Sequence, residues 1–502
     1  FGSRKEGLKF APRQTDNSAM GPEPGFALGV AASSVEAPGR SPSCSSHSSL
    51  SRSASAASSS SSQTAAYCPV GLHPTVRGDI FGGHYCVEGR LGQGQFSTVW
   101  LCRDTRGPAP QQRVALKVYR AVDRYVRYAC EESAILEAVK ACDLASLQRS
   151  FRGGSANASA YNAELPGSVL RLAEHFVHEG PHCRHSCLAL EVLGPCLLDI
   201  AQACRGDRLP LCLLRVAARG CLLGLDLLHR GCNIIHTDLK PENILVRISE
   251  RPQEPPHKRR RLPSKTPAGG RRWKRMTGGD VLDLADKLGG STITFVLADL
   301  GNSVFCNHQV ADEISTCEYK SPEVLLGASY GLPTDVWSLA CCLYEAATGR
   351  YLMDPRLVLA RPRQLRLAEA AAYAAGSTSV RGTPEVPTAE EHIAQVVELC
   401  GALPDALLRE GQRSKQLLRA GADAGVQGTA EQSDTAWSLC TAGLALGDLP
   451  RCGLLSRLEE YLSAEDASQV DQLLGPMLRV SPSARATPQV LLEDLTWLWE
   501  NS

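Results

Sequence analysis

The chain has 502 residues, 43% of them hydrophobic, which is enough material for a large core in about two to four domains. Its 53 basic residues balance 53 acidic ones, so a global charge field for nucleic acid or an anionic membrane is excluded. No secretory signal opens the sequence, and the most apolar stretch, Leu209–Leu228, carries Arg215, Arg219 and Asp226. We therefore expect no membrane span, and we expect the 20 cysteines to stay reduced in the cytosol or nucleus.

Residues 1–70 form a segment that we expect to be a disordered, serine-rich tail. Serine fills 14 of the 22 positions from Ser41 to Ser62, and such a composition cannot build a hydrophobic core.

After this tail, strand-like alternation comes first and helical patterns come later. One helix is expected over 128–141, among strands over 85–91, 98–103, 114–119, 169–177 and 187–192. Beyond Leu193 the chain is mostly helical. This order predicts an α+β fold of two lobes, a small strand-rich lobe over 71–192 and a large helical lobe over 193–498.

Two stretches interrupt the large lobe. A basic spacer insert is expected over 250–290, because residues 251–280 hold ten Lys or Arg against two acidic residues, a net charge of +8. A loop insert rich in Arg, Ala and Gly is expected over 354–387. Trp273 is the only aromatic residue of the basic stretch, too little for a stacking platform, so we expect no direct binding of nucleic acid.

The run from His182 to Cys187 has metal-ligand residue types at close spacing. No second Cys/His pair follows at zinc-finger distance, and Cys187 runs directly into an apolar strand. We expect a hairpin with ordinary thiols rather than a metal site.

A glycine-rich turn is expected between the first two long strands. Glycines let a backbone approach phosphates closely, so that free N–H groups meet the anionic oxygens, although a plain hairpin would also explain the pattern. The usual third glycine is Ser97 here. The candidate phosphate cradle is Leu91, Gly92, Gln93, Gly94, Gln95, Phe96, Ser97, Thr98 and Val99.

Val114-Ala115-Leu116-Lys117 lies on the next expected strand. A strand lysine that points into a cleft can pair with the α- and β-phosphates of a nucleotide, provided that a carboxylate holds it. The following helix supplies Glu131 and Glu132, of which we prefer Glu132. The alternative is a surface lysine beside a solvated acidic helix face.

The segment from His236 to Leu245 fits the pattern H-x-D-x-K-x-x-x-N of a serine/threonine kinase catalytic loop. In that pattern Asp238 orients the substrate hydroxyl and accepts its proton, and Lys240 steadies the transferring phosphoryl group. Asn243 ligates a magnesium ion.

Asp299-Leu300-Gly301 stands in the place of the kinase D-F-G motif, with Asp299 as the main magnesium ligand. The basic insert accounts for its distance from Asp238. Glu323 and Arg485 complete the set as an expected buried ion pair, and a buried Asp335 is expected to anchor the catalytic-loop backbone.

These residues together resemble the SR-protein kinase family. The resemblance covers roughly residues 71–353 and 388–498. It rests on Thr237 in place of the usual arginine, on Asp299-Leu300-Gly301-Asn302, on the hinge-like run Glu191-Val192-Leu193-Gly194 and on the position of the insert. The runner-up is a LAMMER-type or dual-specificity kinase. A pseudokinase scaffold is the alternative of another class, but every catalytic position is filled.

The resemblance implies ATP and Mg²⁺ as cofactors, with Ala115, Glu191 and Leu193 at the nucleotide. It also implies splicing-factor substrates with Arg-Ser repeats and activity without activation-loop phosphorylation. Cys317 and Glu318 depart from the Arg and Gln that the family commonly has there.

Partners and location follow from the same resemblance and from charge. An acidic docking groove would hold Arg-rich segments through Glu391 and Glu398, which lie seven residues apart on one helix face, while the nearby Arg350 opposes such a ligand. The basic clusters within 258–275 resemble a bipartite nuclear import signal. We expect a monomer in cytoplasm and nucleus.

Overall fold

The structure, a computed structural model, describes residues 71–107, 112–248, 293–308, 313–354, 388–420 and 451–499, together with 277–279, 282, 437–440 and 445–449. All of these belong to one compact unit, Ala65–Ser502. The expected tail over 1–70 and most of both expected inserts, 250–290 and 354–387, lie outside the described residues.

Six antiparallel strands form the first part of this unit, in the order β1-β2-β3-β4-β6-β5. Burial alternates at the start of β2, and one face of the sheet packs on a small core around Phe81, Tyr85 and Leu116. Strand β4 is buried on both faces, with Ala115 and Tyr119 in the main core. The strands are β1 (Ile80–Phe81), β2 (Tyr85–Gln93), β3 (Ser97–Asp104), β4 (Arg113–Tyr119), β5 (Leu172–Glu179) and β6 (Arg184–Leu190).

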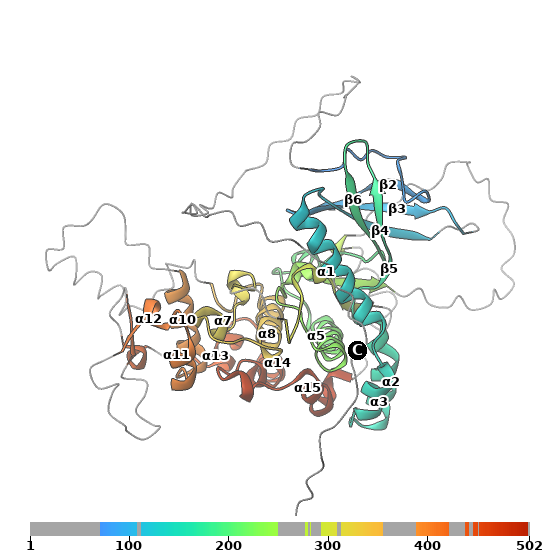
Figure 1. Ribbon diagram of the computed structural model, residues 1–502. Coiled ribbons are helices and arrows are strands. Elements are labelled where there is room, and N and C mark those ends of the chain that lie inside the picture. Colours follow the sequence, from blue (N-terminus) through green and yellow to red (C-terminus); the bar gives the residue numbers. More distant parts are fainter. Residues whose placement is uncertain are drawn as a thin grey trace, which may run out of the picture. The chain divides into compact units, whose positions relative to one another are not determined.

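Helix α1 (Asp123–Lys140) lies against this sheet (Figure 1) and buries Ala129, Glu132, Ile135 and Leu136. It begins five residues before the expected helix at 128–141. Two further helices, α2 (Leu144–Ser150) and α3 (Ser155–Glu164), follow where the sequence indicated no element.

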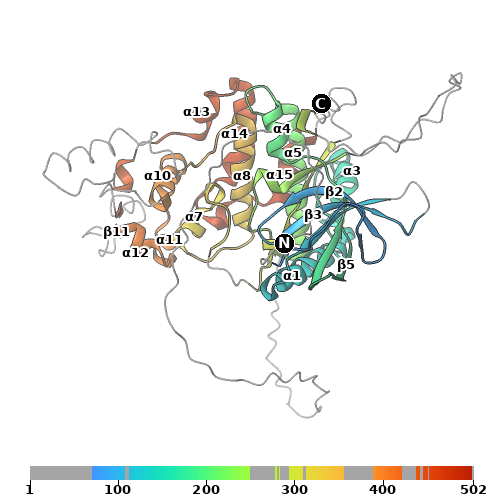
Figure 2. The same cartoon turned by 90° about the horizontal axis from the view of Figure 1, so that it is seen from above.

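The rest of the unit is mainly helical. Its centre is α8 (Pro333–Thr348), which packs against α4, α5 and α14 (Figure 2) and buries Trp337 completely. The other helices are α4 (Leu197–Ala203), α5 (Leu211–Asp226), α7 (Pro322–Leu326), α10 (Thr388–Cys400), α11 (Asp405–Glu410), α12 (Ser414–Leu417), α13 (Leu454–Glu459), α14 (Ala464–Met477) and α15 (Pro488–Asp494).

Three two-stranded sheets complete this part, of which two frame the site described below. Their strands are β7 (Ile234–Ile235) with β10 (Val304–Phe305), β8 (Ile244–Ile248) with β9 (Ile293–Leu297), and β11 (Leu418–Ala420) with β12 (Trp437–Leu439). A strand-rich part followed by a helical part confirms the predicted α+β fold class. Within the described ranges, no helix has the length and hydropathy needed to cross a membrane.

Candidate active site

Lys117 and Glu132 form a buried ion pair between β4 and α1. The Lys117 Nζ atom lies 2.9 Å from Glu132 Oε1 and 2.8 Å from Oε2. Glu132 is 1% exposed, whereas Glu131 faces solvent. The geometry therefore agrees with the choice of Glu132 as the partner of the lysine.

Asp299 joins this pair from the loop after β9. Its Oδ1 atom lies 2.9 Å from Lys117 Nζ, and this contact lowers the pKa of the Asp299 carboxyl despite the opposing effect of burial. Burial alone would lower the pKa of Lys117, but Glu132 and Asp299 raise it well above its ordinary value. Asp299 has φ of 57°, a left-handed conformation that aspartate tolerates better than most residues.

Asp335 of α8 binds the backbone of the catalytic loop. Its carboxylate accepts the His236 N–H at 2.7 Å and the Thr237 N–H at 3.0 Å, and the His229 ring lies 2.9 Å away. Thr237 has φ of 66°, which is strained for a β-branched residue and costs about 1–3 kcal/mol. The Thr237 hydroxyl donates to the Asn302 carbonyl at 2.8 Å, so this strained residue ties the catalytic loop to the loop of Asp299.

Asp238 lies at an open cleft of about 340 Å³ that Lys320 and Asn302 also border. One carboxylate oxygen lies 2.6 Å from Lys240 Nζ, and the other accepts the Thr316 hydroxyl at 2.8 Å. The Asn243 side chain donates to the Asp238 carbonyl at 2.8 Å. The three residues named by the catalytic-loop pattern are therefore together, and Thr316 fixes the carboxylate from the opposite side.

The glycine-rich turn is where the sequence predicts it. Its first residues belong to the end of β2, and its last residues, from Ser97 on, belong to β3. A methyl group added at Gly92 would meet no atom within 4 Å, and one at Gly94 would meet only the Ser97 carbonyl at 3.8 Å. The space beside both glycines is open, as a backbone that receives a ligand requires. Phe96 packs on Tyr125 and Tyr128 of α1, with ring centroids 5.3 and 5.5 Å apart.

The other expected nucleotide residues differ in their surroundings. Ala115 is buried, and Leu91, Val99 and Leu193 are partly buried against the same core. The remaining members of the cradle follow the turn, with Gln93 and Gln95 exposed and Ser97 and Thr98 buried.

Glu191 uses its side chain within the protein. Its carboxylate pairs with Arg247 at 2.5 Å and accepts the Arg171 N–H at 2.9 Å. The Glu191 side chain is thus a structural clamp of the segment between the two parts.

The donor set fits a magnesium nucleotide. Asp299 and Asn243 offer oxygen ligands, which magnesium prefers, beside the positive charge of Lys117 and the open glycine turn. Such a group, when bound, supplies the phosphoryl group and neutralises its charge. Holding and orienting it falls to the residues above.

Glu323 and Arg485 form the buried pair that the sequence predicts. Both side chains are 0% exposed, and two Arg485 nitrogens lie 2.6 Å from the two Glu323 oxygens. Arg485 also donates to the carbonyls of Arg479 and Val480. The pair joins α7 to the segment before α15.

Side-chain contacts hold residues 313–320, the described stretch that precedes Ser321. The Ser315 hydroxyl donates to the Thr237 carbonyl at 2.8 Å, and Tyr319 donates to Glu345 at 2.6 Å. Arg413, before α12, lies 2.6 Å from Glu313. Burial, together with nearby carboxylates, raises the pKa of Glu345 to about 7, although the Tyr319 bond opposes this.

Glu391 and Glu398 lie on α10, as expected, but they are less open than a docking groove suggests. Glu391 is 8% exposed, and the Glu398 side chain is 13% exposed. Arg457 of α13 lies 3.8 Å from Glu398. Burial and Glu391 raise the pKa of the Glu398 carboxyl, and Arg457 lowers it.

Two side-chain contacts of the candidate site residues were not expected from the sequence. The Tyr119 hydroxyl donates to Glu132, and Arg457 stands beside Glu398. Tyr119 follows Lys117 by two strand positions and therefore shares its face, so strand periodicity could have found it. Arg457 carries no such signal, because α13 reaches α10 only in the fold.

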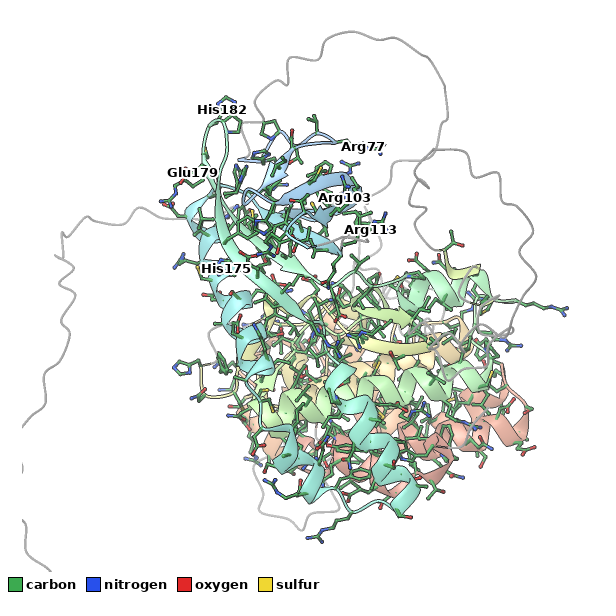
Figure 3. All side chains as sticks on the ribbon, turned by 90° about the vertical axis from the view of Figure 1, so that its right-hand side faces the viewer. Arg77, Arg103, Arg113, His175, Glu179 and His182 are labelled. Atoms are coloured by element: carbon green, nitrogen blue, oxygen red, sulfur yellow. The ribbon has the colours of Figure 1, made fainter. Side chains whose placement is uncertain are left out.

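The run from His182 to Cys187 forms the predicted hairpin between β5 and β6, with His182 at its tip (Figure 3). Cys187 is buried in the sheet core. Within the described residues, no three metal-ligating side chains are placed to hold a metal ion.

Comparison with known proteins supplies the family. A model of the protein kinase domain matches residues 85–254 and 284–497, more than half of the chain, and its gap falls inside the basic insert. Serine/threonine-protein kinase SRPK of Physarum polycephalum is 28% identical over 450 residues, which are 86% of this chain and 89% of the relative. Protein kinase dsk1 of Schizosaccharomyces pombe is 28% identical over 518 residues, 86% of this chain and 83% of the relative. SRSF protein kinase 3 of Homo sapiens is 26% identical over 571 residues, which cover 86% of this chain and 89% of the relative.

Proposed function

From the premise that this chain belongs to the protein kinase family, we propose that it phosphorylates Arg/Ser-rich proteins such as splicing factors, and so regulates mRNA splicing. Its relatives include serine/threonine-protein kinase SRPK and SRSF protein kinase 3, and the chain is a serine/threonine kinase of this type. The observation that carries the proposal is the Asp238 carboxylate, held between Lys240 and Thr316 at an open cleft.

The proposed roles follow the contacts. Asp238 orients the substrate hydroxyl and accepts its proton, while Lys240 steadies the phosphoryl group in transfer. Glu132 holds Lys117 for the phosphates, and Asn243 and Asp299 ligate magnesium. The nucleotide is bordered by Leu91, Gly92, Gln93, Gly94, Gln95, Phe96, Ser97, Thr98, Val99, Ala115, Glu191 and Leu193.

We expect the enzyme to be active without phosphorylation of the segment between Asn302 and Ser321. Contacts of its described residues 313–320 support this expectation, because Ser315 donates to the Thr237 carbonyl and Thr316 donates to Asp238. The arginine that receives an activating phosphate in other kinases is replaced by Thr237, whose hydroxyl contacts the Asn302 carbonyl instead.

Substrate docking is proposed at Glu391 and Glu398 of α10. Two carboxylates on one helix face attract arginines through charge-assisted hydrogen bonds, which salt weakens. Arg457, which lies 3.8 Å from Glu398, reduces this attraction. Docking here is therefore expected to be weak and sensitive to salt.

Residues 258–275, outside the described residues, are proposed to engage the nuclear import machinery, and the protein is proposed to act as a monomer in cytoplasm and nucleus. Deleting 251–280 should exclude the protein from nuclei and leave catalysis intact. Continued nuclear concentration of the deleted protein would refute this role.

The experiment that tests the function is phosphorylation in vitro of an Arg-Ser repeat peptide beside an equally charged Lys-Ala-Ser peptide, with mapping of the modified residues. We expect serine in the Arg-Ser repeats to be modified with a kcat/KM at least about 10-fold above that of the control peptide. Equal use of both peptides would contradict the proposed substrate class.

A further inference from the structure

Tyr119 is the last residue of β4 and is 2% exposed. It follows Lys117 by two positions, so both side chains leave the strand on the face that meets α1. The Tyr119 hydroxyl donates a hydrogen bond to Glu132 Oε2, the same oxygen that lies 2.8 Å from Lys117 Nζ. The lysine also lies over the tyrosine ring, with Nζ 5.4 Å from the ring centroid.

The backbone of Tyr119 is fixed from both sides. It pairs in register with Ser97, the first residue after the glycine-rich turn, and its carbonyl lies 2.9 Å from the ring nitrogen of His185. The next residue, Arg120, donates its N–H to the Phe96 carbonyl at 3.0 Å. The phenol is therefore held by the same strand pairing that places the glycine-rich turn.

Glu132 shares Lys117 with Asp299, so a second hydrogen-bond donor to Glu132 matters at this site. Lys117 serves two carboxylates at once, with Nζ within 2.9 Å of both Glu132 and Asp299. Burial, together with Glu132, raises the pKa of the Tyr119 phenol above its ordinary value, although Lys117 opposes this, so Tyr119 stays a neutral donor. Glu132 thus has a second hydrogen-bond donor that does not depend on the lysine.

We propose that Tyr119 is a positioning residue of the catalytic site, which supports Glu132 so that Lys117 can turn toward nucleotide phosphates. This inference rests on the proposed roles of Lys117 and Glu132. A buried carboxylate that loses its partners is costly, so without Tyr119 both Glu132 oxygens depend on Lys117. The lysine is then held away from the phosphates, and nucleotide binding weakens.

The alternative is that Tyr119 only fills the core beneath α1. The substitution Tyr119→Phe separates the two explanations, because it keeps the ring and removes only the hydroxyl. Tyr161→Phe is the matched control, since the Tyr161 hydroxyl also binds a buried carboxylate beside a cation, Asp226 with Arg230, and none of these three residues is among those named for the nucleotide.

The test is titration of the full-length protein with Mg–ATP by calorimetry, followed by steady-state kinetics. We expect Tyr119→Phe to raise the dissociation constant and the KM for Mg–ATP about 10-fold, as loss of a hydrogen bond to a charged group implies. The KM for the peptide and the kcat at saturating ATP should change less than about 2-fold. Tyr161→Phe should leave all of these values unchanged.

A double variant tests whether Tyr119 acts through Glu132, which a residue that only fills the core would not do. If Tyr119 acts through Glu132, adding Tyr119→Phe to Glu132→Gln should weaken Mg–ATP binding no further. Should Tyr119→Phe fold poorly, Tyr119→Val replaces it in the cycle with Glu132→Gln, where the coupling between the two positions, not the size of the single effect, is compared. Nucleotide affinity within about 2-fold of the wild type, or an additive effect in the double variant, would overturn the proposal.

Failure of this inference is distinct from failure of the proposed function. The titration needs no protein substrate, so it reports on Tyr119 even if Arg-Ser peptides are not phosphorylated. Conversely, unchanged nucleotide binding in Tyr119→Phe leaves the substrate assignment untouched.

Discussion

Each catalytic carboxylate is held by a different set of neighbours, and this separates the roles proposed for them. Asp238 contacts Lys240 and Thr316, both within the helical part. Asp299 contacts Lys117 from the strand-rich part. Loss of Asp238 should therefore affect the positioning of the reacting hydroxyl, and loss of Asp299 should affect binding of the nucleotide.

The first prediction compares Asp238→Ala with Asp299→Ala. The former should lower kcat by about 10³-fold or more and leave Mg–ATP affinity nearly unchanged, because it removes the group that positions the nucleophile. The latter should also weaken Mg²⁺-dependent nucleotide binding. Binding titrations and single-turnover kinetics measure both, and near-normal turnover in either variant would sink the assignment.

The second prediction concerns stability at the buried pair of Arg485 and Glu323, whose side chains are both 0% exposed. Arg485→Met leaves a buried carboxylate unpaired and should cost about 3–5 kcal/mol of the free energy of unfolding. Arg409→Met is the control, because Arg409 pairs with Asp405 at the surface and should cost less than about 0.5 kcal/mol. Urea unfolding monitored by circular dichroism distinguishes the two, and equal losses would contradict the prediction.

At the scale of elements, the segment before β1 contacts the hairpin of β5 and β6 through rings that meet at tilted or edge-on angles. The His73 ring is 4.8 Å from Phe81, 5.3 Å from His178 and 5.1 Å from His185. Burial and the neighbouring histidines, including His182, lower the pKa of His73 to about 4, although Asp79 opposes this.

The third prediction follows from the sign of this shift. The folded protein binds fewer protons at His73 than the unfolded chain does between pH 6.5 and about 4. The stability that the neutral ring contributes is thus present above pH 6.5 and is lost as the pH falls toward 4. The melting temperature should fall less between pH 7.5 and 5.0 in His73→Gln than in the wild type. The exposed control His308→Gln should behave as the wild type does, and parallel curves for all three proteins would refute the prediction.

The fourth prediction concerns docking on α10. The double variant Glu391→Lys with Glu398→Lys should raise the KM for a long Arg-Ser substrate about 5-fold and spare a short peptide. The effect is modest because Arg457 already neutralises part of Glu398. Reversal of the exposed Glu459 and Glu465 is the charge-matched control. If long and short substrates lose equally, or neither loses, α10 is not a docking surface.

The sequence anticipates the elements that carry strong local patterns. The strands expected over 85–91, 98–103 and 114–119 match β2, β3 and β4 to within two residues at each end, because residue type and spacing specify them locally. The roles read from the catalytic-loop motif stay a prediction. The helices α2 and α3 were missed, since these two short segments are rich in Ser and Ala and have weak hydrophobic periodicity. Tertiary contacts stabilise them instead, such as the stacking of Phe151 on Tyr161 at 4.1 Å and the bond from Tyr161 to Asp226.

The same distinction applies to the site. Residues within a motif were identified from the sequence, and the fold brings Lys117, Glu132, Asp238 and Asp299 to the expected neighbours. Contacts that depend on which elements meet in space were not identified. The Arg457–Glu398 pair is of this kind, because 59 positions separate the two residues and neither helix pattern indicates the other.

At the scale of the whole molecule, ion pairs join the strand-rich and helical parts, among them Lys117 with Asp299 at the site and Arg247 with Glu191 at the segment between the two parts. Within the helical part, the hydroxyls of Ser315 and Thr316 donate hydrogen bonds to Thr237 and Asp238 of the catalytic loop. These contacts need no phosphate to form. We therefore propose a serine kinase that is active without phosphorylation of the segment between Asn302 and Ser321.

The most direct test is transfer of labelled γ-phosphate from ATP to an Arg-Ser repeat protein by full-length enzyme made in bacteria and treated with phosphatase. Asp238→Ala is the inactive control. The account predicts label on serine at the same rate before and after phosphatase treatment, and none above background with Asp238→Ala. Loss of activity on phosphatase treatment, or label that persists in Asp238→Ala, would contradict it.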